Sequence, residues 1–367
     1  MRSPPPAKIH RVATAIVSDL HLGTVSGADV ARRPEALAGL FEVAASADRL
    51  ILLGDLLELR ERPTAAVLED VAPLLRRLGE ATAGKQVVLV PGNHDYQLVA
   101  PALERARVAG DSALGLDGSY DPHADDLAGR VAALMPRSEL SVAYPGLWLR
   151  DDVYATHGHY LDVHMTVPRV ESLIAAAVER FGTRLDDAGP STPEHYEAIL
   201  APLYALAHAI AQNARAHPHV RRNNLSRDVW RAATGNGRKG RVKRAAIGRV
   251  AIPGAVAAIN AAGLGPFRAD ISSQELRRAG LRAMAEVVDR LGIQADYAIF
   301  GHTHRAGPLN GESDEWRSEA GVRLVNSGSW LYEDTFIDGD GPSNPYWPGR
   351  VVWLDAEGAP RLESALG

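Results

Sequence analysis

The stretch Val17-Ser18-Asp19-Leu20-His21-Leu22-Gly23 decides how the rest of the chain is interpreted. It ends an apolar run, Val12–Val17, whose Ala, Ile and Val content is typical of a buried strand. Asp19 and His21 are two residues apart, so both side chains can face one cation as the chain leaves the strand. Taken alone, the pair is better explained structurally, as a helix cap and a loop histidine. Its meaning therefore depends on partners elsewhere in the chain.

The composition limits the classes of protein and of site. A length of 367 residues, with 46% hydrophobic and 23% charged residues, fits one large soluble domain with an elaboration, or two ordinary domains. The formal net charge of −5 argues against a generally basic nucleic-acid binder. With no cysteine, the chain has neither disulfides nor thiolate metal sites, so any metal must take oxygen and nitrogen ligands. The start has no long apolar signal peptide, so we expect a cytoplasmic protein, with contact to a membrane surface as an option.

Strands and helices alternate in the first hundred residues. The patterns predict helices over Pro34–Ala47 and Pro63–Ala83, and buried strands over Arg49–Leu53 and Gln86–Val90. Three strands alternating with two helices indicate a βαβ sheet, whose functional groups lie beyond the carboxyl ends of the strands. Each of these strand ends carries polar residues that can bind a metal.

Later strand patterns end in the same way. Short strands around Tyr144-Pro145-Gly146 predict a hairpin, and the last of them leads into Thr156-His157-Gly158-His159. The strand predicted over Asp296–Phe300 leads into Gly301-His302-Thr303-His304. Between these blocks the sequence is helical, rich in alanine and broken by proline and glycine. We therefore expect a core of residues 8–166 and 293–367, with residues 167–292 forming an inserted helical subdomain or lid.

The candidate ligands share one position, the junction between a strand and the loop that follows it. They are Asp19, His21, Asp55, Asn93, His94, His157, His302 and His304. Each has a structural explanation of its own, as a cap, a turn residue or a core histidine. Five junctions that all end in metal-competent residues are poorly explained by structure alone.

The blocks Ser18-Asp19-Leu20-His21, Gly54-Asp55, Gly92-Asn93-His94-Asp95, His157-Gly158 and Gly301-His302-Thr303-His304 resemble the calcineurin-like metallophosphoesterase superfamily. All five blocks occur in order, and together they are specific, although the resemblance does not cover the helical insert. It implies an α/β fold of the four-layer αββα sandwich type, with a dinuclear metal centre at the sheet edge. That fold would carry a large helical insertion.

The resemblance also assigns the ligands. It places Asp19, His21 and His304 on one metal, Asn93, His157 and His302 on the other, and Asp55 between them. A bridging carboxylate can hold two divalent cations about 3.5–4 Å apart, which clamps a phosphate and lowers the pKa of a bridging water, the implied nucleophile. Imidazole, carboxylate and amide donors suit Mn²⁺, Fe²⁺ or Zn²⁺ equally.

Other polar residues near the blocks have assigned or open roles. His94 matches the family histidine that contacts the phosphate and helps the leaving oxygen depart, and we expect Asp95 to orient it. His159, Asp162 and His164 follow the fourth block. They either face solvent and satisfy one another, or support the ligands and contact substrate, and His159 is the candidate for substrate binding.

Part of the expected insert is strongly basic, whereas the chain as a whole has a negative net charge. From Arg215 to Arg249, eleven basic residues stand against Asp228 alone, and Val250–Phe267 then has no charged residue. This segment is too broken for a membrane span, but it suits an interfacial element or a lid over an amphiphilic phosphorylated substrate, with Arg238 and Arg241 as substrate-binding candidates. An ordinary helical subdomain with solvated arginines explains the pattern equally well.

Within the superfamily, the chain is similar to the UDP-2,3-diacylglucosamine pyrophosphatase group, but His94 replaces its usual arginine and the insert is longer. We expect hydrolysis of a phosphate ester or pyrophosphate, on a small-molecule, lipid-linked or sugar-linked substrate. One alternative is an inactive scaffold that binds a protein partner, although no ligand position is missing. Another is a nuclease, which the scarcity of aromatic residues near the arginines disfavours.

Overall fold

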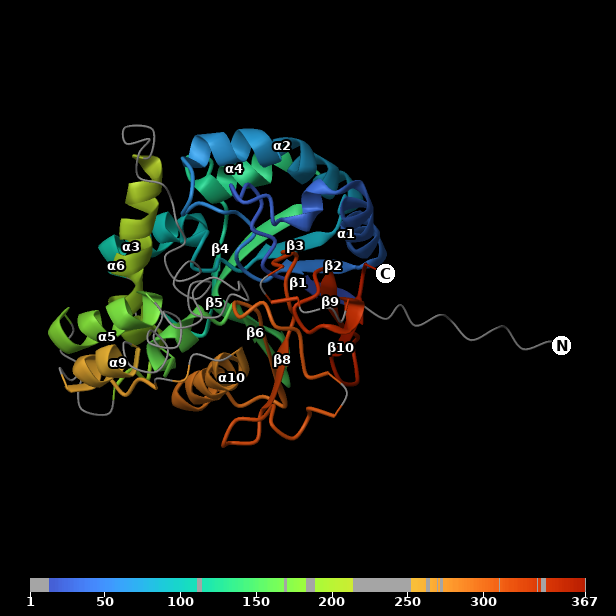
Figure 1. Ribbon diagram of the computed structural model, residues 1–367. Helices are drawn as coiled ribbons and strands as arrows, with labels where there is room; N and C mark the ends of the chain where they lie inside the picture. The colour runs from blue at the N-terminus through green and yellow to red at the C-terminus, as the bar shows by residue number, and fades with distance from the viewer. Residues whose placement is uncertain are drawn as a thin grey trace, which may run out of the picture.

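The computed structural model describes residues 13–110, 114–167, 170–182, 189–213, 252–261, 265–268, 270, 273–309, 311–334, 336–337 and 341–366 (Figure 1). Its strands are β1 (Thr14–Val17), β2 (Arg49–Leu52), β3 (Gln86–Leu89), β4 (Asp117–Tyr120), β5 (Glu139–Arg150), β6 (Val153–Thr156), β7 (Tyr297–Phe300), β8 (Arg323–Asn326), β9 (Arg350–Leu354) and β10 (Arg361–Ser364).

The helices are α1 (Pro34–Ser46), α2 (Thr64–Ala81), α3 (Ala100–Ala109), α4 (Leu127–Leu134), α5 (Val170–Gly182), α6 (Pro193–Gln212), α9 (Ile252–Ala261) and α10 (Ser273–Arg290). Short 3₁₀ helices are η1 (Val30–Arg32), η2 (Tyr96–Leu98), η3 (His159–His164) and η5 (Gly341–Ser343). Among the helices of the described residues, none combines the length and the apolar character needed to cross a bilayer.

The strands form a continuous sheet in the order β10-β9-β1-β2-β3-β5-β6-β7-β8, with β4 beside β5. Strands β1, β2, β3 and the first half of β5 are parallel neighbours, as the alternating helices and strands predict. The second half of β5 pairs antiparallel with β6, and β6, β7 and β8 run parallel. The long strand β5 therefore belongs to both halves of a curled sheet.

The two halves of the sheet pack face to face. Residues of one strand alternate between faces, so Ile16 and Ile51 point into a core that also holds Ala155 and Ile299 of the other half. Their neighbours Val17 and Leu52 face the opposite way, into a second core under the helices. Both faces of the strands are thus buried, which explains their continuous apolar runs.

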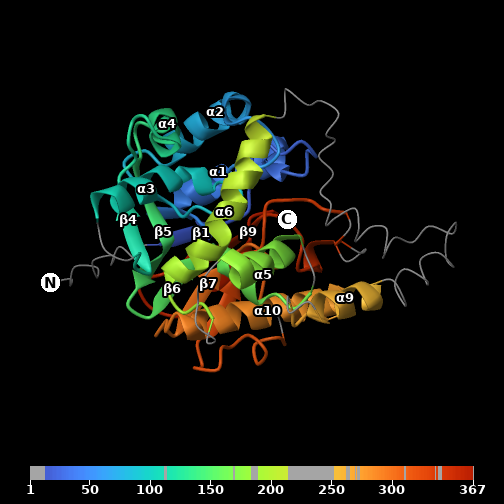
Figure 2. The same cartoon turned by 90° about the vertical axis from the view of Figure 1, so that its left-hand side faces the viewer.

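Helices complete the outer layers (Figures 1 and 2). Helices α1, α2 and α4 cover one half of the sheet, and α10 covers the other. Met284, Val287 and Val288 of α10 are buried in the same core as Phe300 and Leu324. The expected α/β fold of layers αββα is confirmed. Helix α10 lies within residues 167–292 but supplies one of the four layers.

The predicted hairpin is present between β5 and β6, but its turn lies at Asp151 and Asp152 rather than at Tyr144-Pro145-Gly146, because β5 runs through these residues. The strand changes partner here: pairing with β3 extends to Val142, and pairing with β6 begins at Gly146. A proline lacks the N–H needed inside a ladder, so it is tolerated at Pro145, which is the last residue of β5 paired with β4 and precedes the ladder with β6. Its carbonyl still accepts a hydrogen bond from Oγ1 of Thr156, at 2.8 Å.

Candidate metal centre

Five loops converge at one rim of the curled sheet. Each follows a strand, namely β1, β2, β3, β6 or β7. Main-chain hydrogen bonds tie the loops together. The amide of Asp19 donates to the carbonyl oxygen of Gly54 at 3.0 Å, and the amide of Gly301 donates to the carbonyl oxygen of His157 at 3.0 Å. The predicted strand-end residues therefore meet, although Asp19 and His304 lie 285 positions apart in the chain.

The backbone is strained at these residues. Among the described residues other than glycine, the positive φ angles belong to Asp19 (54°), His21 (44°), Asp55 (50°), His302 (64°) and His304 (59°). All five are predicted ligands. A left-handed conformation costs a residue with a Cβ about 1–2 kcal/mol, so it persists where the surrounding structure enforces it, most often at functional sites.

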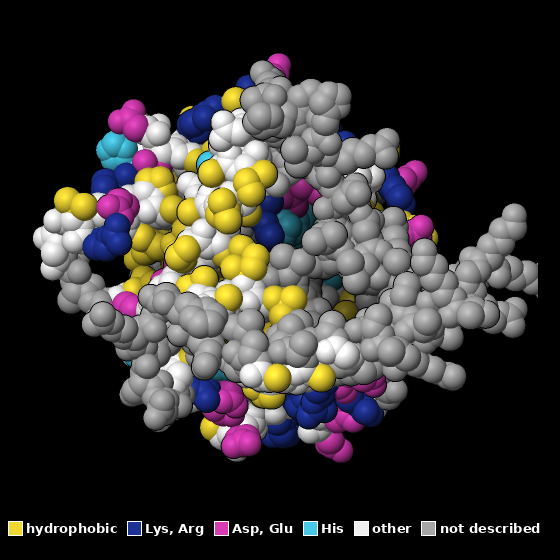
Figure 3. Space-filling view, turned by 60° about the vertical axis from the view of Figure 1, so that its left-hand side comes forward, with side chains coloured by type: hydrophobic (Ala, Val, Ile, Leu, Met, Phe, Trp, Pro, Cys, Tyr) yellow, Lys and Arg dark blue, Asp and Glu magenta, His cyan; other side chains and the backbone are white. Residues whose placement is uncertain are grey.

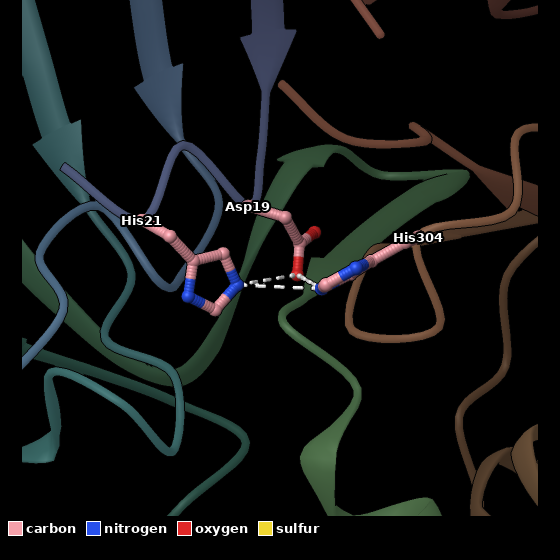
Figure 4. Close-up of side chains that lie close together, drawn as sticks. All are labelled: Asp19, His21 and His304. Carbon is pink, nitrogen blue, oxygen red and sulfur yellow. Dashed lines mark hydrogen bonds and ion pairs between the residues drawn. The ribbon is translucent and has the colours of Figure 1, made fainter. Parts of the chain in front are cut away.

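Asp19, His21 and His304 form a first group, in which the side chains point toward one another (Figure 4). Nε2 of His304 lies 3.4 Å from Oδ1 of Asp19 and 3.3 Å from Nε2 of His21. Two imidazole nitrogens and a carboxylate oxygen at this spacing are the donors of a divalent cation site.

Asp55, His157 and His302 form a second group, which Asn93 joins. Nε2 of His157 lies 3.3 Å from Oδ2 of Asp55, and Oδ1 of Asn93 lies 3.1 Å from Nδ1 of His302. The same Oδ2 of Asp55 lies 3.5 Å from Nε2 of His21, in the first group. The Asp55 carboxylate thus stands between the two groups.

Glycines leave room for these side chains. A Cβ on Gly54, whose φ is +86°, would lie 2.1 Å from Nδ1 of His157. A Cβ on Gly92 would lie 2.3 Å from Oδ1 of Asp55, and one on Gly301 would lie 2.5 Å from Oδ2 of Asp19. These three glycines are therefore required by the close approach of candidate ligand side chains.

Carboxylates outside the two groups hold the imidazoles. Oε2 of Glu58 lies 3.2 Å from Nδ1 of His21, and Oδ1 of Asp162 lies 3.1 Å from Nε2 of His302. Oε2 of Glu333 lies 3.8 Å from Nδ1 of His304. Histidine ligands are commonly oriented in this way, through the ring nitrogen that does not face the metal. Of the three acids, only Asp162 is among the residues that the sequence singles out.

The expected pairing of His94 with Asp95 is wrong. Nδ1 of His94 lies 2.6 Å from Oε2 of Glu58, whereas the Asp95 carboxylate accepts hydrogen bonds from the amides of Gly92 and Leu56, each at 2.7 Å. Asp95 therefore ties the loop after β3 to the loop after β2. Burial and the charge of Asp55 raise the pKa of Asp95 to about 7.

The other predicted contacts lie apart from the two groups. His159 is buried behind His157, and its Nε2 lies 3.1 Å from the hydroxyl of Tyr144. These are the surroundings of a packed residue rather than of a substrate contact. Nε2 of His164 lies 2.7 Å from the hydroxyl of Tyr196. The substrate-binding candidates Arg238 and Arg241 lie outside the described residues.

The sequence model of the calcineurin-like phosphoesterase family matches residues 13–202, which is more than half of the chain. The chain belongs to the calcineurin-like phosphoesterase family. The match includes the loops after β1, β2, β3 and β6. It ends before His302 and His304, which the fold brings to the same rim.

A solved structure, described as a dimetal phosphatase from Danio rerio, is also similar to the chain. The two share 10% sequence identity, the similarity covers 97% of this chain and 99% of that one, and the TM-score is 0.34.

The donor set fits the metal centre of a calcineurin-like phosphoesterase. His157 is buried, and Nδ1 lies 3.0 Å from the carbonyl oxygen of Leu53. Its Nε2, which faces Asp55, has no hydrogen-bond partner within the part of the chain that the structure describes. A buried imidazole nitrogen without a hydrogen-bond partner costs free energy, and coordination to a bound cation would satisfy it.

Electrostatics supports the same assignment. Burial opposes a charge on His304, but hydrogen bonds to Asp19 and Glu333 outweigh it and raise the pKa of His304 to about 10. Burial likewise opposes a charge on His157, and the nearby Asp55 outweighs it and raises the pKa of His157 to about 9. The buried carboxylates therefore attract positive charge strongly, which two divalent cations would supply in place of protons.

Proposed function

We propose that this chain is a metal-dependent phosphoesterase that hydrolyses a phosphate ester or pyrophosphate at a dinuclear centre. Asp19, His21 and His304 would hold one cation, and Asn93, His157 and His302 the other, with the Asp55 carboxylate shared. The observation that carries the proposal is that Asp55 adjoins the group of Asp19, His21 and His304 as well as His157 and His302, with Asn93 beside His302. Mn²⁺, Fe²⁺ and Zn²⁺ all suit these donors.

When bound, two divalent cations would clamp a phosphate and lower the pKa of a water between them. The chain's own contribution beyond the ligands is His94. Glu58 holds its Nδ1, so its Nε2 is directed away from that carboxylate, and Nη1 of Arg60 lies 3.4 Å from it. His94 is more exposed than the ligand His21, with 23% against 4% of the side chain accessible. It would donate a hydrogen bond or a proton to the departing oxygen.

We also propose that the substrate is linked to an apolar group, such as a lipid. Helix α6 presents Leu206 and Ile210 to solvent, with 57% and 56% of each residue exposed. Figure 3 shows hydrophobic side chains gathered on this face, beside a hollow in which histidine and basic side chains are visible. Large apolar side chains on a helix face are suited to an acyl chain, since their burial by a ligand is favourable.

Residues 167–292 are proposed to be an insert that forms one wall of the substrate cleft. Helix α6 is attached at both ends. Near its start, Glu197 accepts hydrogen bonds from the hydroxyls of Tyr96 and Tyr160, at 2.7 and 2.8 Å. Near its end, Oε1 of Gln212 accepts a hydrogen bond from the amide of Thr64 at 3.1 Å. Two attachments favour a fixed wall over a lid that moves as a whole.

Substitution of the shared carboxylate tests the activity. Asp55→Asn and His304→Ala should each reduce hydrolysis of 4-nitrophenyl phosphate with Mn²⁺ to background, while circular dichroism shows a retained fold. Wild-type turnover in either variant would disprove the dinuclear mechanism. Elemental analysis of the purified wild-type protein separates the enzyme from an inactive scaffold, for which we expect a metal stoichiometry near zero.

A further inference from the structure

Arg60 lies beside His94 because one carboxylate fixes both residues. The amide of Arg60 donates a hydrogen bond to Oε1 of Glu58 at 2.9 Å, and Oε2 of the same carboxylate lies 2.6 Å from Nδ1 of His94. Glu58 is buried, so this arrangement is held by the protein interior rather than by mobile surface groups. The loop after β2 thus brings a basic side chain to the residue proposed to meet the leaving oxygen.

The guanidinium of Arg60 reaches the outward-facing atom of His94. Nη1 of Arg60 lies 3.4 Å from Nε2 of His94, the ring nitrogen that Glu58 does not hold. The ring of His94 in turn lies 4.5 Å from that of the ligand His21, measured between centroids. An anion bound at the metal ligands would therefore have the Arg60 guanidinium on its His94 side.

We propose that Arg60 binds a charged oxygen of the substrate phosphoryl group and thereby selects phosphomonoesters over diesters. The proposal rests on the phosphoesterase function proposed above. A phosphomonoester has three non-bridging oxygens, so two can face the cations while the third accepts a hydrogen bond from Arg60, beside the departing oxygen that His94 would meet. In a diester the third oxygen carries a second organic group and has no charge. Arginine is suited to this contact, because its planar guanidinium presents N–H donors that match phosphate oxygens and it stays charged.

Arg62 supplies a matched control from the same loop. Its Nη1 forms an ion pair with Asp70 at 2.5 Å and lies 3.4 Å from the carbonyl oxygen of Gly23. Arg62 is thus joined to α2 and to the loop after β1. A general effect of removing positive charge near the site would appear in both variants, whereas a phosphoryl contact belongs to Arg60 alone.

The test compares Arg60→Gln, Arg62→Gln and the wild-type full chain with Mn²⁺. The substrates are 4-nitrophenyl phosphate, a monoester, and bis(4-nitrophenyl) phosphate, a diester. We expect Arg60→Gln to lower kcat/KM for the monoester about 10²–10³-fold, the usual effect of losing one donor to a developing charge. The diester should lose less than about 5-fold, and Arg62→Gln should leave both substrates within that range. Equal losses on both substrates would overturn the selectivity.

A binding measurement without turnover completes the test. Calorimetric titration with inorganic phosphate should give an affinity at least about 10-fold weaker for Arg60→Gln than for Arg62→Gln, at equal metal content by elemental analysis. Equal phosphate affinity, or loss of metal from Arg60→Gln, would overturn the assignment of Arg60. If the wild-type protein hydrolyses neither ester, the proposed activity fails, and the phosphate titration still decides whether Arg60 binds a phosphoryl group.

Discussion

Oε2 of Glu58 lies 2.6 Å from Nδ1 of His94 and 3.2 Å from Nδ1 of His21. One buried carboxylate therefore orients both a predicted metal ligand and the histidine proposed to assist the leaving group. The two imidazoles hold the pKa of Glu58 well below its usual range, against the opposing effect of burial. Glu58 thus stays charged under ordinary conditions and fixes which nitrogen of each ring faces the site.

Glu58→Gln should lower kcat/KM by about 10–100-fold, the usual cost of losing a carboxylate that supports a metal ligand. The amide cannot serve two imidazoles as the carboxylate does. The control is Glu61→Gln, because Glu61 accepts hydrogen bonds from Oγ1 of Thr24 and the amide of Val25 in the same region without contacting a ligand. Steady-state kinetics with metal analysis distinguishes the two variants. Equal kcat/KM values for Glu58→Gln and Glu61→Gln would show that Glu58 does not support the site.

Gly54→Ala should disrupt the second ligand group. Its Cβ would lie 2.1 Å from the His157 ring, so the imidazole must move away from Asp55. Gly84→Ala is the matched control, because Gly84 also has a positive φ (+72°) but no atom within 4 Å of the added Cβ. Both variants should lose about 1 kcal/mol of stability to the left-handed backbone. Metal titration should show weakened binding in Gly54→Ala alone.

The sequence predicts which side chains meet at the sheet rim, because each of their blocks follows an apolar run that can be recognised locally. Asp19, Asp55 and His302 lie just past strands whose both faces are buried, and such runs contain few polar residues. Their positions at the sheet rim follow from the parallel order of the strands. The pattern of a single chain is sufficient here because each block of candidate ligands follows a strand of its own.

Supporting residues are harder to predict, since their partners lie far away in the chain. Glu197 resembles an ordinary polar residue of a helix, and its tyrosine partners lie on β5, η2 and η3. Glu58 carried a usable signal that the sequence interpretation missed. It stands among Leu56, Leu57 and Leu59, and an acid within an apolar segment indicates a buried carboxylate that needs partners.

Glu197→Ala should destabilise the protein by at least about 2 kcal/mol, because it removes the acceptor of three buried tyrosine hydroxyls. Burial raises the pKa of Glu197, and the hydrogen bonds from Tyr144, Tyr96 and Tyr160 offset part of that increase. Glu194→Ala, in the first turn of the same helix, is the control. Urea denaturation measures both. If the free energies of unfolding of Glu197→Ala and Glu194→Ala differ by less than about 0.5 kcal/mol, this cluster does not anchor α6.

His164 should make the protein sensitive to acid. Burial, together with the charge of Arg290, lowers the pKa of His164 to about 4 from the ordinary 6.5. Because the folded pKa is depressed, the unfolded chain binds the proton more readily. The stability contributed by neutral His164 is therefore fully present above pH 6.5 and is lost as the pH falls toward 4. The lost contact is the one between His164 and Tyr196 of α6.

His164→Gln keeps a polar group for Tyr196 but cannot take up a proton. Its melting temperature should lie near or below that of the wild type at pH 7 and rise relative to it at pH 5 and again at pH 4. Each pH unit between the two pKa values corresponds to about 1.4 kcal/mol. His123→Gln removes an exposed histidine, with 56% of the side chain accessible, and should show no such trend. If the melting temperatures of His164→Gln and the wild type differ by the same amount from pH 7 to pH 4, unfolding does not change the pKa of His164.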